Sequence, residues 1–152
     1  MAKELVILDD DRQYALARIS ELQNEIQALG PEFYEVFNQS SETWHDNAPF
    51  DALRDRQSVL DAELQQLRNV LRSSSLTIPK PRKGMVGIGS RVVLQNGAAY
   101  LVAGDWTPRA GQNWQGAIVI NCNTPLAQQI IGKKVGAEIQ VGHITTHIEE
   151  VQ

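Results

Sequence analysis

The segment SSETWHDNAPFD, residues 40–51, gathers residue types that are suited to chemistry at one short stretch of the chain. Glu42 and Asp46 supply two carboxylates, and Trp44 lies between them. Tryptophan is enriched among the residues that anchor protein interfaces. The segment therefore predicts a site that presents acidic groups and an aromatic anchor to a partner.

The same residues also have a simpler structural interpretation. Asp46 or Asn47 would cap a helix that starts here, because both side chains accept hydrogen bonds from free helical amides. Glu42 would then be a solvated loop charge, and Trp44 would pack onto its own hairpin. Capping and a further functional role are compatible, because one carboxylate oxygen of Asp46 can still face outward.

Two apolar repeats flank this segment and predict the helices that position it. Before the segment, residues recur with alternating spacings of three and four at Ile19, Leu22, Ile26, Leu29, Phe33 and Val36. After it, the same spacing is filled by Phe50, Leu53, Gln57, Leu60, Leu64, Leu67 and Leu71. This is the pattern of two helices that pack along one seam, and the short connection makes them antiparallel. We expect a coiled-coil hairpin over residues 1–75 with its tip at 40–51, kinked but not reversed at Pro31.

Charge and helix-breaking residues divide the chain after this hairpin. Residues 1–75 contain 14 Asp and Glu against 7 Lys and Arg, whereas residues 76–152 contain 4 against 7. Pro79 and Pro81 prevent continuation of the second helix. We predict a linker over 76–84 and a second domain over 85–152. The linker cations Lys80, Arg82 and Lys83 suit contact with nucleic acid or with an acidic protein surface.

The second domain is predicted to be mostly strand. Short β-branched or apolar runs occur in VGIGSRVVLQ, AAYLVAG, GAIVIN, AEIQVG and HITTHIEEVQ. Asn96-Gly97 predicts a type I′ turn, and Asn123-Thr124-Pro125 predicts the start of a short helix that ends at Gly132. The fold class is therefore α+β, with an antiparallel sheet and one short helix. His143 and His147 fall on one edge strand, about 13 Å apart and too far for one metal ion.

Composition limits the broad class of the protein. No apolar run approaches the roughly 18 residues of a membrane span, and the start MAKELVILDDD has no hydrophobic core of a signal peptide. The single Cys122 lies in an apolar run and is expected to be a small buried hydrophobe. We expect a monomer in a reducing cytoplasm, with no membrane partner and no metal bound by the free protein.

Several of these motifs resemble the bacterial Gre transcript-cleavage factors, over nearly the whole chain. NTPLAQQIIGKKVGAEIQV, residues 123–141, is similar to the family's serine-proline, small-helix, Gly-Lys-Lys-Val-Gly signature. DNAPFDALRDRQ, residues 46–57, resembles the Glu-Asn-Ala-Glu-Tyr run that opens the second hairpin helix, and Gly30-Pro31-Glu32 falls where the family carries Pro-Glu. The resemblance implies an FKBP-like second domain without isomerase activity.

The resemblance also implies a function. A Gre factor binds bacterial RNA polymerase from outside, its carboxy-terminal domain docking on the rim of the secondary channel while the hairpin enters. Acidic tip residues, here Asp46 assisted by Glu42, help to hold a second Mg²⁺ bound by the polymerase, which then cleaves its backtracked RNA. A second metal ion stabilises the attacking and leaving oxygens of such a reaction. The factor is then no enzyme itself, needs no cofactor of its own, and meets the RNA 3′ end only within the complex.

The tip departs from the family pattern at several positions. Asp46 stands where the family has Glu, and Thr43 stands where it has its first acid. Pro49 and Phe50 replace a Glu and a Tyr. Some Gre homologues with altered tips inhibit the polymerase, so stimulation of cleavage and inhibition both stay open. Trp44 and Asn47 at the tip, and Trp106, Arg109 and Trp114 in the loop DWTPRAGQNWQ, are the candidate binding residues.

Two other functions remain as alternatives from the residues alone. An FKBP-like isomerase or chaperone would need an aromatic-lined proline pocket, but the second domain offers only Tyr100, Trp106 and Trp114. A coiled-coil adaptor would use the tip only to bind protein.

Overall fold

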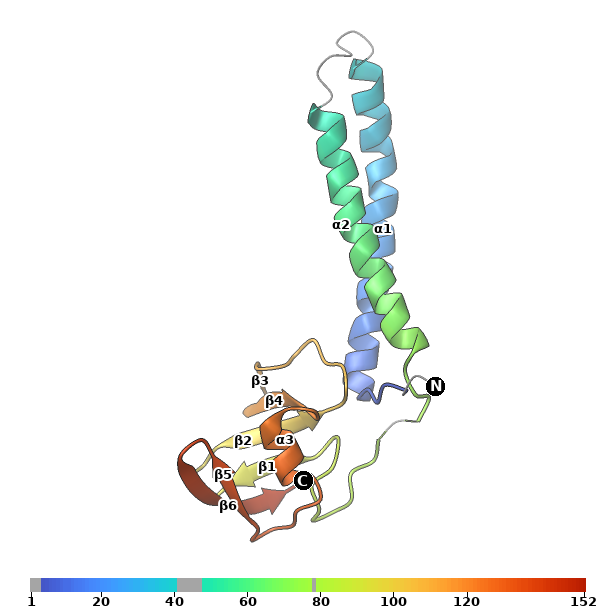
Figure 1. Ribbon diagram of the computed structural model, residues 1–152. Coiled ribbons are helices and arrows are strands. Elements are labelled where there is room, and N and C mark those ends of the chain that lie inside the picture. Colours follow the sequence, from blue (N-terminus) through green and yellow to red (C-terminus); the bar gives the residue numbers. More distant parts are fainter. Residues whose placement is uncertain (1–3, 41–47, 78) are drawn as a thin grey trace. The chain divides into compact units, whose positions relative to one another are not determined.

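The computed structural model in Figure 1 describes residues 4–40, 48–77 and 79–152. It divides into two compact units, Gln13–Arg72 and the combination of Met1–Arg12 with Ser73–Gln152. We refer to them as the hairpin unit and the sheet unit, and we describe each by itself.

The hairpin unit is made by helices α1 (Asp9–Ser40) and α2 (Ala48–Arg72). Helix α1 runs unbroken through Pro31, as the register of the apolar repeat predicted. The predicted seam is the buried one, with its best-covered side chains at Leu22, Leu29, Leu60, Leu64 and Leu67. Early residues of α1 meet late residues of α2, since Arg18 pairs with Glu63 while Phe33 packs edge-on against Phe50 at 5.6 Å between ring centroids. The helices are therefore antiparallel, and the predicted hairpin is confirmed.

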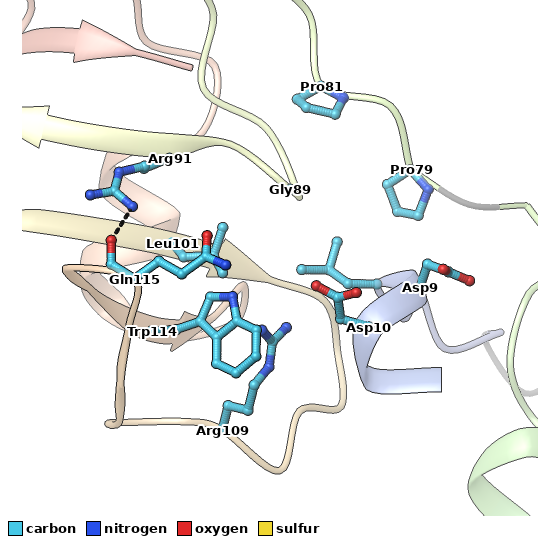
Figure 2. A pocket seen from close by; sticks show the side chains of 11 residues that line it. Asp9, Asp10, Pro79, Pro81, Gly89, Arg91, Leu101, Arg109, Trp114 and Gln115 are labelled. Carbon is cyan, nitrogen blue, oxygen red and sulfur yellow. Dashed lines mark hydrogen bonds between the residues drawn. The ribbon is translucent and has the colours of Figure 1, made fainter. Parts of the chain in front are cut away.

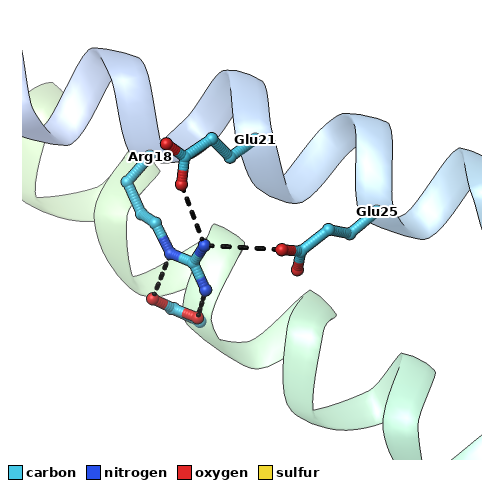
Figure 3. Close-up of polar contacts among 4 residues, drawn as sticks. Arg18, Glu21 and Glu25 are labelled. Carbon is cyan, nitrogen blue, oxygen red and sulfur yellow. Dashed lines mark hydrogen bonds and ion pairs between the residues drawn. The ribbon is translucent and has the colours of Figure 1, made fainter.

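A polar cluster fixes the axial register of the two helices (Figure 3). Arg18 donates from Nε and Nη2 to the two carboxylate oxygens of Glu63, at 2.9 and 3.0 Å, and from Nη1 to Glu21 at 3.1 Å. The hydrogen bonds from Arg18 lower the pKa of Glu63, and the hydrogen bonds to Glu63 and Glu21 raise the pKa of Arg18. These side chains are partly exposed, so the cluster sets alignment more than it adds stability.

Truncation of Leu64 tests the seam directly. Leu64 is only 8% exposed in the middle of α2, so Leu64→Ala is expected to destabilise the protein by about 2 to 4 kcal/mol through lost burial and a residual cavity. Val59 on the same helix is 67% exposed, so Val59→Ala serves as the control and should change stability little. Urea denaturation followed by circular dichroism measures both. Equal effects of the two substitutions would show that the arms are not packed at this level.

The sheet unit is α+β, as predicted. Its strands are β1 (Arg91–Leu94), β2 (Ala99–Ala103), β3 (Asn113–Trp114), β4 (Ala117–Asn121), β5 (Glu138–Val141) and β6 (Ile144–Val151). Over the described residues they form one sheet in the order β3-β4-β2-β1-β6-β5. The short helix α3 (Pro125–Ile130) buries Ala127 and Ile130 in a core with Val86, Val92, Leu94, Val102, Cys122, Ile139 and Ile148. Cys122 is a buried member of this core, as the sequence indicated.

Three details of the sheet differ from the sequence-based predictions. The sheet is mixed and not wholly antiparallel, because β2 and β4 pair in parallel; the long loop between them lets the chain return to the same end of the sheet. Strand β6 lies between β1 and β5, so the strand that carries His147 is not an edge strand, and His143 precedes this strand in a turn. Asn96-Gly97 does not form a type I′ turn, since only Gly97 has positive φ and the Asn96 side chain accepts the amide proton of Ala98.

The predicted start of α3 is confirmed. Thr124 is the N-cap, its Oγ1 accepts the amide of Ala127 at 3.2 Å, and Pro125 occupies the first turn. Gly132 follows the helix at φ +86°, a conformation that glycine adopts without strain. The signature segment is therefore held by local capping chemistry.

The amino-terminal segment belongs to the sheet unit, an arrangement that the heptad pattern did not indicate. Leu5 exchanges backbone hydrogen bonds with Ser73 and Ser75 at 2.8 and 2.7 Å. Val6 donates to a carboxylate oxygen of Asp105 at 2.7 Å and accepts the Asp105 amide at 2.6 Å. Ile7 is fully buried. Residues before α1 thus join the stretch that follows α2 to the end of strand β2.

Gly104 permits this close approach. A Cβ at position 104 would lie 2.0 Å from the carbonyl oxygen of Val6, so the amino-terminal backbone would have to move. We expect Gly104→Ala to destabilise the sheet unit by about 1 to 3 kcal/mol. Gly87→Ala is the matched control, because a Cβ there meets nothing within 4 Å. Urea denaturation monitored by tryptophan fluorescence compares them, and equal midpoints would refute the tight contact.

Candidate functional site

The candidate tip site lies outside the described residues. Glu42, Trp44, Asp46 and Asn47 all fall between the end of α1 at Ser40 and the start of α2 at Ala48. The structure does describe the supports on either side, where Phe33 and Phe50 hold the first turns of α2 against α1. The roles of the four tip residues therefore stay predictions.

The described part of the chain contains a second candidate site, a pocket of about 380 Å³ in the sheet unit (Figure 2). Its apolar lining comes from Leu8, Pro79, Pro81 and Leu101, and its polar lining includes Asp9, Asp10, Arg91, Arg109 and Gln115, with Trp114 beside Arg109. Arg91 reaches across to donate to the backbone oxygen of Gln115 at 2.6 Å. We call this pocket the Trp114 pocket.

Arg109 is buried beneath this surface in an internal ion pair. Its Nε donates to Oδ1 of Asp11 at 2.8 Å, and the Asp11 side chain has no exposed area. The Trp114 ring lies 4.7 Å from the guanidinium carbon, in cation–π contact. Within the described residues, Nη1 and Nη2 of Arg109 and Oδ2 of Asp11 are buried without a hydrogen-bond partner. Arg109 therefore acts here as the support of Trp114, with its charge neutralised by Asp11.

The two tryptophans of the long loop lie in different surroundings. Trp114 is 40% exposed and lines the Trp114 pocket, so part of its indole ring is accessible. Trp106 is half-buried and does not line the Trp114 pocket. The structure thus brings two of the three predicted loop anchors together, Arg109 and Trp114, and places only the tryptophan of that pair at the surface.

Two acidic residues that organise this unit were not singled out in the sequence. Asp11 belongs to an acidic run that is typical of the first turn of a helix. No local pattern indicates its partner Arg109, 98 positions away in the sequence. Asp105 accepts hydrogen bonds from the Val6 amide and from Nδ2 of Asn123 at 3.0 Å. Its backbone oxygen also accepts Nδ2 of Asn121 at 2.8 Å. Asp105 thereby ties the amino-terminal segment to the start of the signature helix.

Neither a metal cluster nor a membrane helix is found in the described parts of the chain. No group of three or more His, Cys, Asp or Glu residues there is arranged to hold a metal ion. Among the same residues, no helix is long and apolar enough to cross a bilayer.

In comparison with known proteins, the chain is similar to transcription elongation factors named GreA. No protein-family model matches the chain. The chain is 31% identical to transcription elongation factor GreA of a Nitratiruptor species over 156 aligned positions, which cover 91% of this chain and 90% of that protein. It is also 31% identical to GreA of Orientia tsutsugamushi (strain Boryong) over 102 positions, which cover 63% of this chain and 61% of that protein.

Solved structures of GreA factor homolog 1 (Gfh1) are similar over nearly the whole chain. The Thermus thermophilus protein aligns over 99% of both chains at 15% identity with a TM-score of 0.40. The Thermus aquaticus protein aligns over 99% of both chains at 15% identity with a TM-score of 0.41.

The fold and the candidate sites define the class of this protein. It is an α+β protein in which an antiparallel helical hairpin carries an acidic, tryptophan-containing connection, and a mixed sheet carries a capped short helix. With 31% identity to a GreA protein across nine-tenths of both sequences, the chain belongs to the GreA family of transcription elongation factors.

Proposed function

We propose that this protein binds bacterial RNA polymerase during elongation and acts through the tip of its hairpin. The observation that carries the proposal is the near full-length relationship to a transcription elongation factor GreA. The antiparallel helices α1 and α2 support this proposal, because the segment that connects them contains Glu42 and Asp46. The protein would modulate the polymerase's own activity and would not be an enzyme itself.

The proposed reaction is cleavage of backtracked RNA in the polymerase active centre. Asp46 keeps a carboxylate beside Asn47, where the family carries its second acid, and Glu42 is the nearest acid to the position of Thr43. Two carboxylates with waters and phosphate oxygens suit an octahedral Mg²⁺. That ion would activate water and stabilise the departing oxygen. The role of this chain is to orient the polymerase-bound ion with Asp46, assisted by Glu42.

Trp44 and Trp114 are the proposed contacts with the polymerase surface. Trp44 would fix the tip against the channel wall, and Trp114 would supply an apolar anchor on the sheet unit, where it is 40% exposed. Arg109 supports Trp114 through its cation–π contact. Trp106 is half-buried and would contribute less.

Inhibition of the polymerase is the second candidate function, favoured by the tip itself. Thr43 removes one of the two acids that the family uses, and Pro49 removes a further acid. A tip with a single well-placed carboxylate would occupy the channel without completing the metal site. Such a factor would slow nucleotide addition.

One assay separates the two functions. Purified protein is added to a stalled, backtracked elongation complex with labelled RNA, and shortened RNA is measured over time at low and high Mg²⁺. Faster shortening of the RNA than in polymerase alone supports stimulated cleavage. Unchanged cleavage together with slower nucleotide addition at low Mg²⁺ supports inhibition. Absence of any effect and of polymerase binding would reject both.

A further inference from the structure

A second pocket in the sheet unit combines apolar and basic residues that the proposed tip mechanism does not use. Its volume is about 460 Å³, and it lies between the segment that follows α2 and the end of α3. Its apolar lining comes from Pro79, Pro81, Met85, Val86, Ile88 and Ile131. We call it the linker groove. It shares only Pro79 and Pro81 with the Trp114 pocket.

Backbone hydrogen bonds give the linker groove a fixed floor. Val86 donates to the carbonyl of Lys133 at 2.9 Å, and Gly132 donates to the carbonyl of Val86 at 2.8 Å. Met85 forms an isolated antiparallel bridge with Lys134. Val86 is buried in the main core. The floor is therefore pre-organised, and the two lysines that follow α3 are held beside it.

Positive charge gathers around this apolar floor. Lys80 and Arg82 line the groove, Lys83 and Lys133 directly follow lining residues in the chain, and Lys134 forms the backbone bridge with Met85. These are five of the seven Lys and Arg residues of positions 76–152, and all five are exposed. The described residues that line the groove include no Asp or Glu. Within the part of the chain that the structure describes, none of the five cations forms an ion pair.

We propose that the linker groove binds an acidic protein segment that inserts an apolar side chain between flanking carboxylates. The groove is complementary to such a segment, because an apolar pocket flanked by charges of one sign selects a partner with an apolar centre and the opposite charge. The proposal rests on the proposed function in one respect, that the segment belongs to RNA polymerase. The groove would then be a docking contact separate from the tip and from Trp114.

Nucleic acid fits this surface less well. The cations would attract phosphates, but bases of a single strand bind by stacking on aromatic rings, and the described lining of the groove has no aromatic residue. Aliphatic side chains and prolines instead match the apolar side chains of a protein. A contact that depended on the rim charges alone would favour nucleic acid.

Neutralising the rim tests the electrostatic half of the proposal. The variant Lys80→Gln/Arg82→Gln removes two charges from exposed positions. Its control, Gln95→Glu/Thr145→Glu, changes net charge by the same amount at exposed positions that do not line the groove. The rim variant of the full-length protein should associate with core polymerase about tenfold more slowly at low salt, and nearly normally at high salt. The control should associate like wild type.

Shortening an apolar side chain of the groove tests the apolar half of the proposal. Met85 lines the groove and is not a member of the buried core cluster, so Met85→Ser should leave the fold intact. Its control is Leu76→Ser, at an apolar residue that is 92% exposed and does not line the groove. Met85→Ser should dissociate from core polymerase about fivefold faster, because loss of an apolar contact acts mainly on the dissociation rate. Melting curves confirm that both variants are folded.

The outcomes separate the two proposals. Wild-type protein that does not bind polymerase would overturn the proposed function and the groove contact with it. Wild-type binding that neither variant changes beyond its control would overturn the groove contact alone. A parallel titration with labelled single-stranded RNA covers the other class of partner. Loss of RNA binding in the rim variant, with normal polymerase dissociation in Met85→Ser, would assign the surface to nucleic acid and overturn the proposal.

Discussion

Asp46→Asn is expected to lower the stimulated rate of RNA cleavage by about 10- to 100-fold, while polymerase binding stays near that of wild type. The substitution keeps the size of the side chain and its capacity to cap a helix, but it removes the charge that would face the Mg²⁺. Loss of a group that orients a metal site costs activity in this range. Cleavage of RNA in a backtracked complex gives the rate, and competition with labelled wild-type protein gives the affinity.

Asp55→Asn is the matched control for this substitution. Asp55 is an exposed acid on α2, outside the tip, and its replacement by Asn also exchanges a carboxylate for an amide. It should leave both cleavage and affinity unaltered. Equal cleavage by the Asp46 variant and wild type would remove Asp46 from the mechanism. Weaker binding of the Asp46 variant, with normal cleavage once saturated, would make it a contact residue.

The largest expected effect on stability comes from the buried ion pair of the sheet unit. Asp11→Ala should destabilise this unit by about 3 to 5 kcal/mol, because it leaves the Arg109 guanidinium buried without a counter-charge. Arg109 is only 9% exposed, and its hydrogen bond to Asp11 joins the first turn of α1 to the long loop that carries Trp114. Urea denaturation followed by tryptophan fluorescence reports the loss.

Asp10→Ala separates the ion pair from the general effect of an acid at a helix start. Asp10 also lies in the first turn of α1 but is exposed, so its loss removes only the favourable interaction with the helix dipole. Adding Arg109→Met to Asp11→Ala should restore much of the stability, since the buried charge is then gone. Similar denaturation midpoints for the Asp10 and Asp11 variants would show that the pair is not a buried one.

The hairpin could be predicted from the sequence because its interactions repeat. Leucines recur at Leu60, Leu64 and Leu67, and the same spacing recurs before the tip, so the seam follows from helix geometry alone. The start of α3 was predictable for a related reason, since Thr124-Pro125 contains its own cap. The acidic positions of the tip were also evident from the sequence, but their roles await the cleavage assay.

Turn and sheet details were harder to predict because they depend on distant residues. Whether β2 pairs with β4 in parallel is decided by how the long loop returns the chain, and no local pattern encodes that path. The type I′ turn predicted at Asn96-Gly97 is wrong, because Asn96 does not adopt positive φ and its side chain instead accepts the amide proton of Ala98. Local propensity could not distinguish these arrangements.

By itself the sequence determined the paired helices, the α+β class, the capped short helix and the relationship to Gre factors, since each depends on neighbouring residues or on a short motif. Only the tertiary structure showed that Asp11 neutralises Arg109 and that Asp105 and Gly104 hold the amino-terminal segment. It also showed that Lys80 and Arg82 of the linker line an apolar groove. Those contacts join residues far apart in the chain, so their energies depend on burial and distance that a linear pattern does not contain.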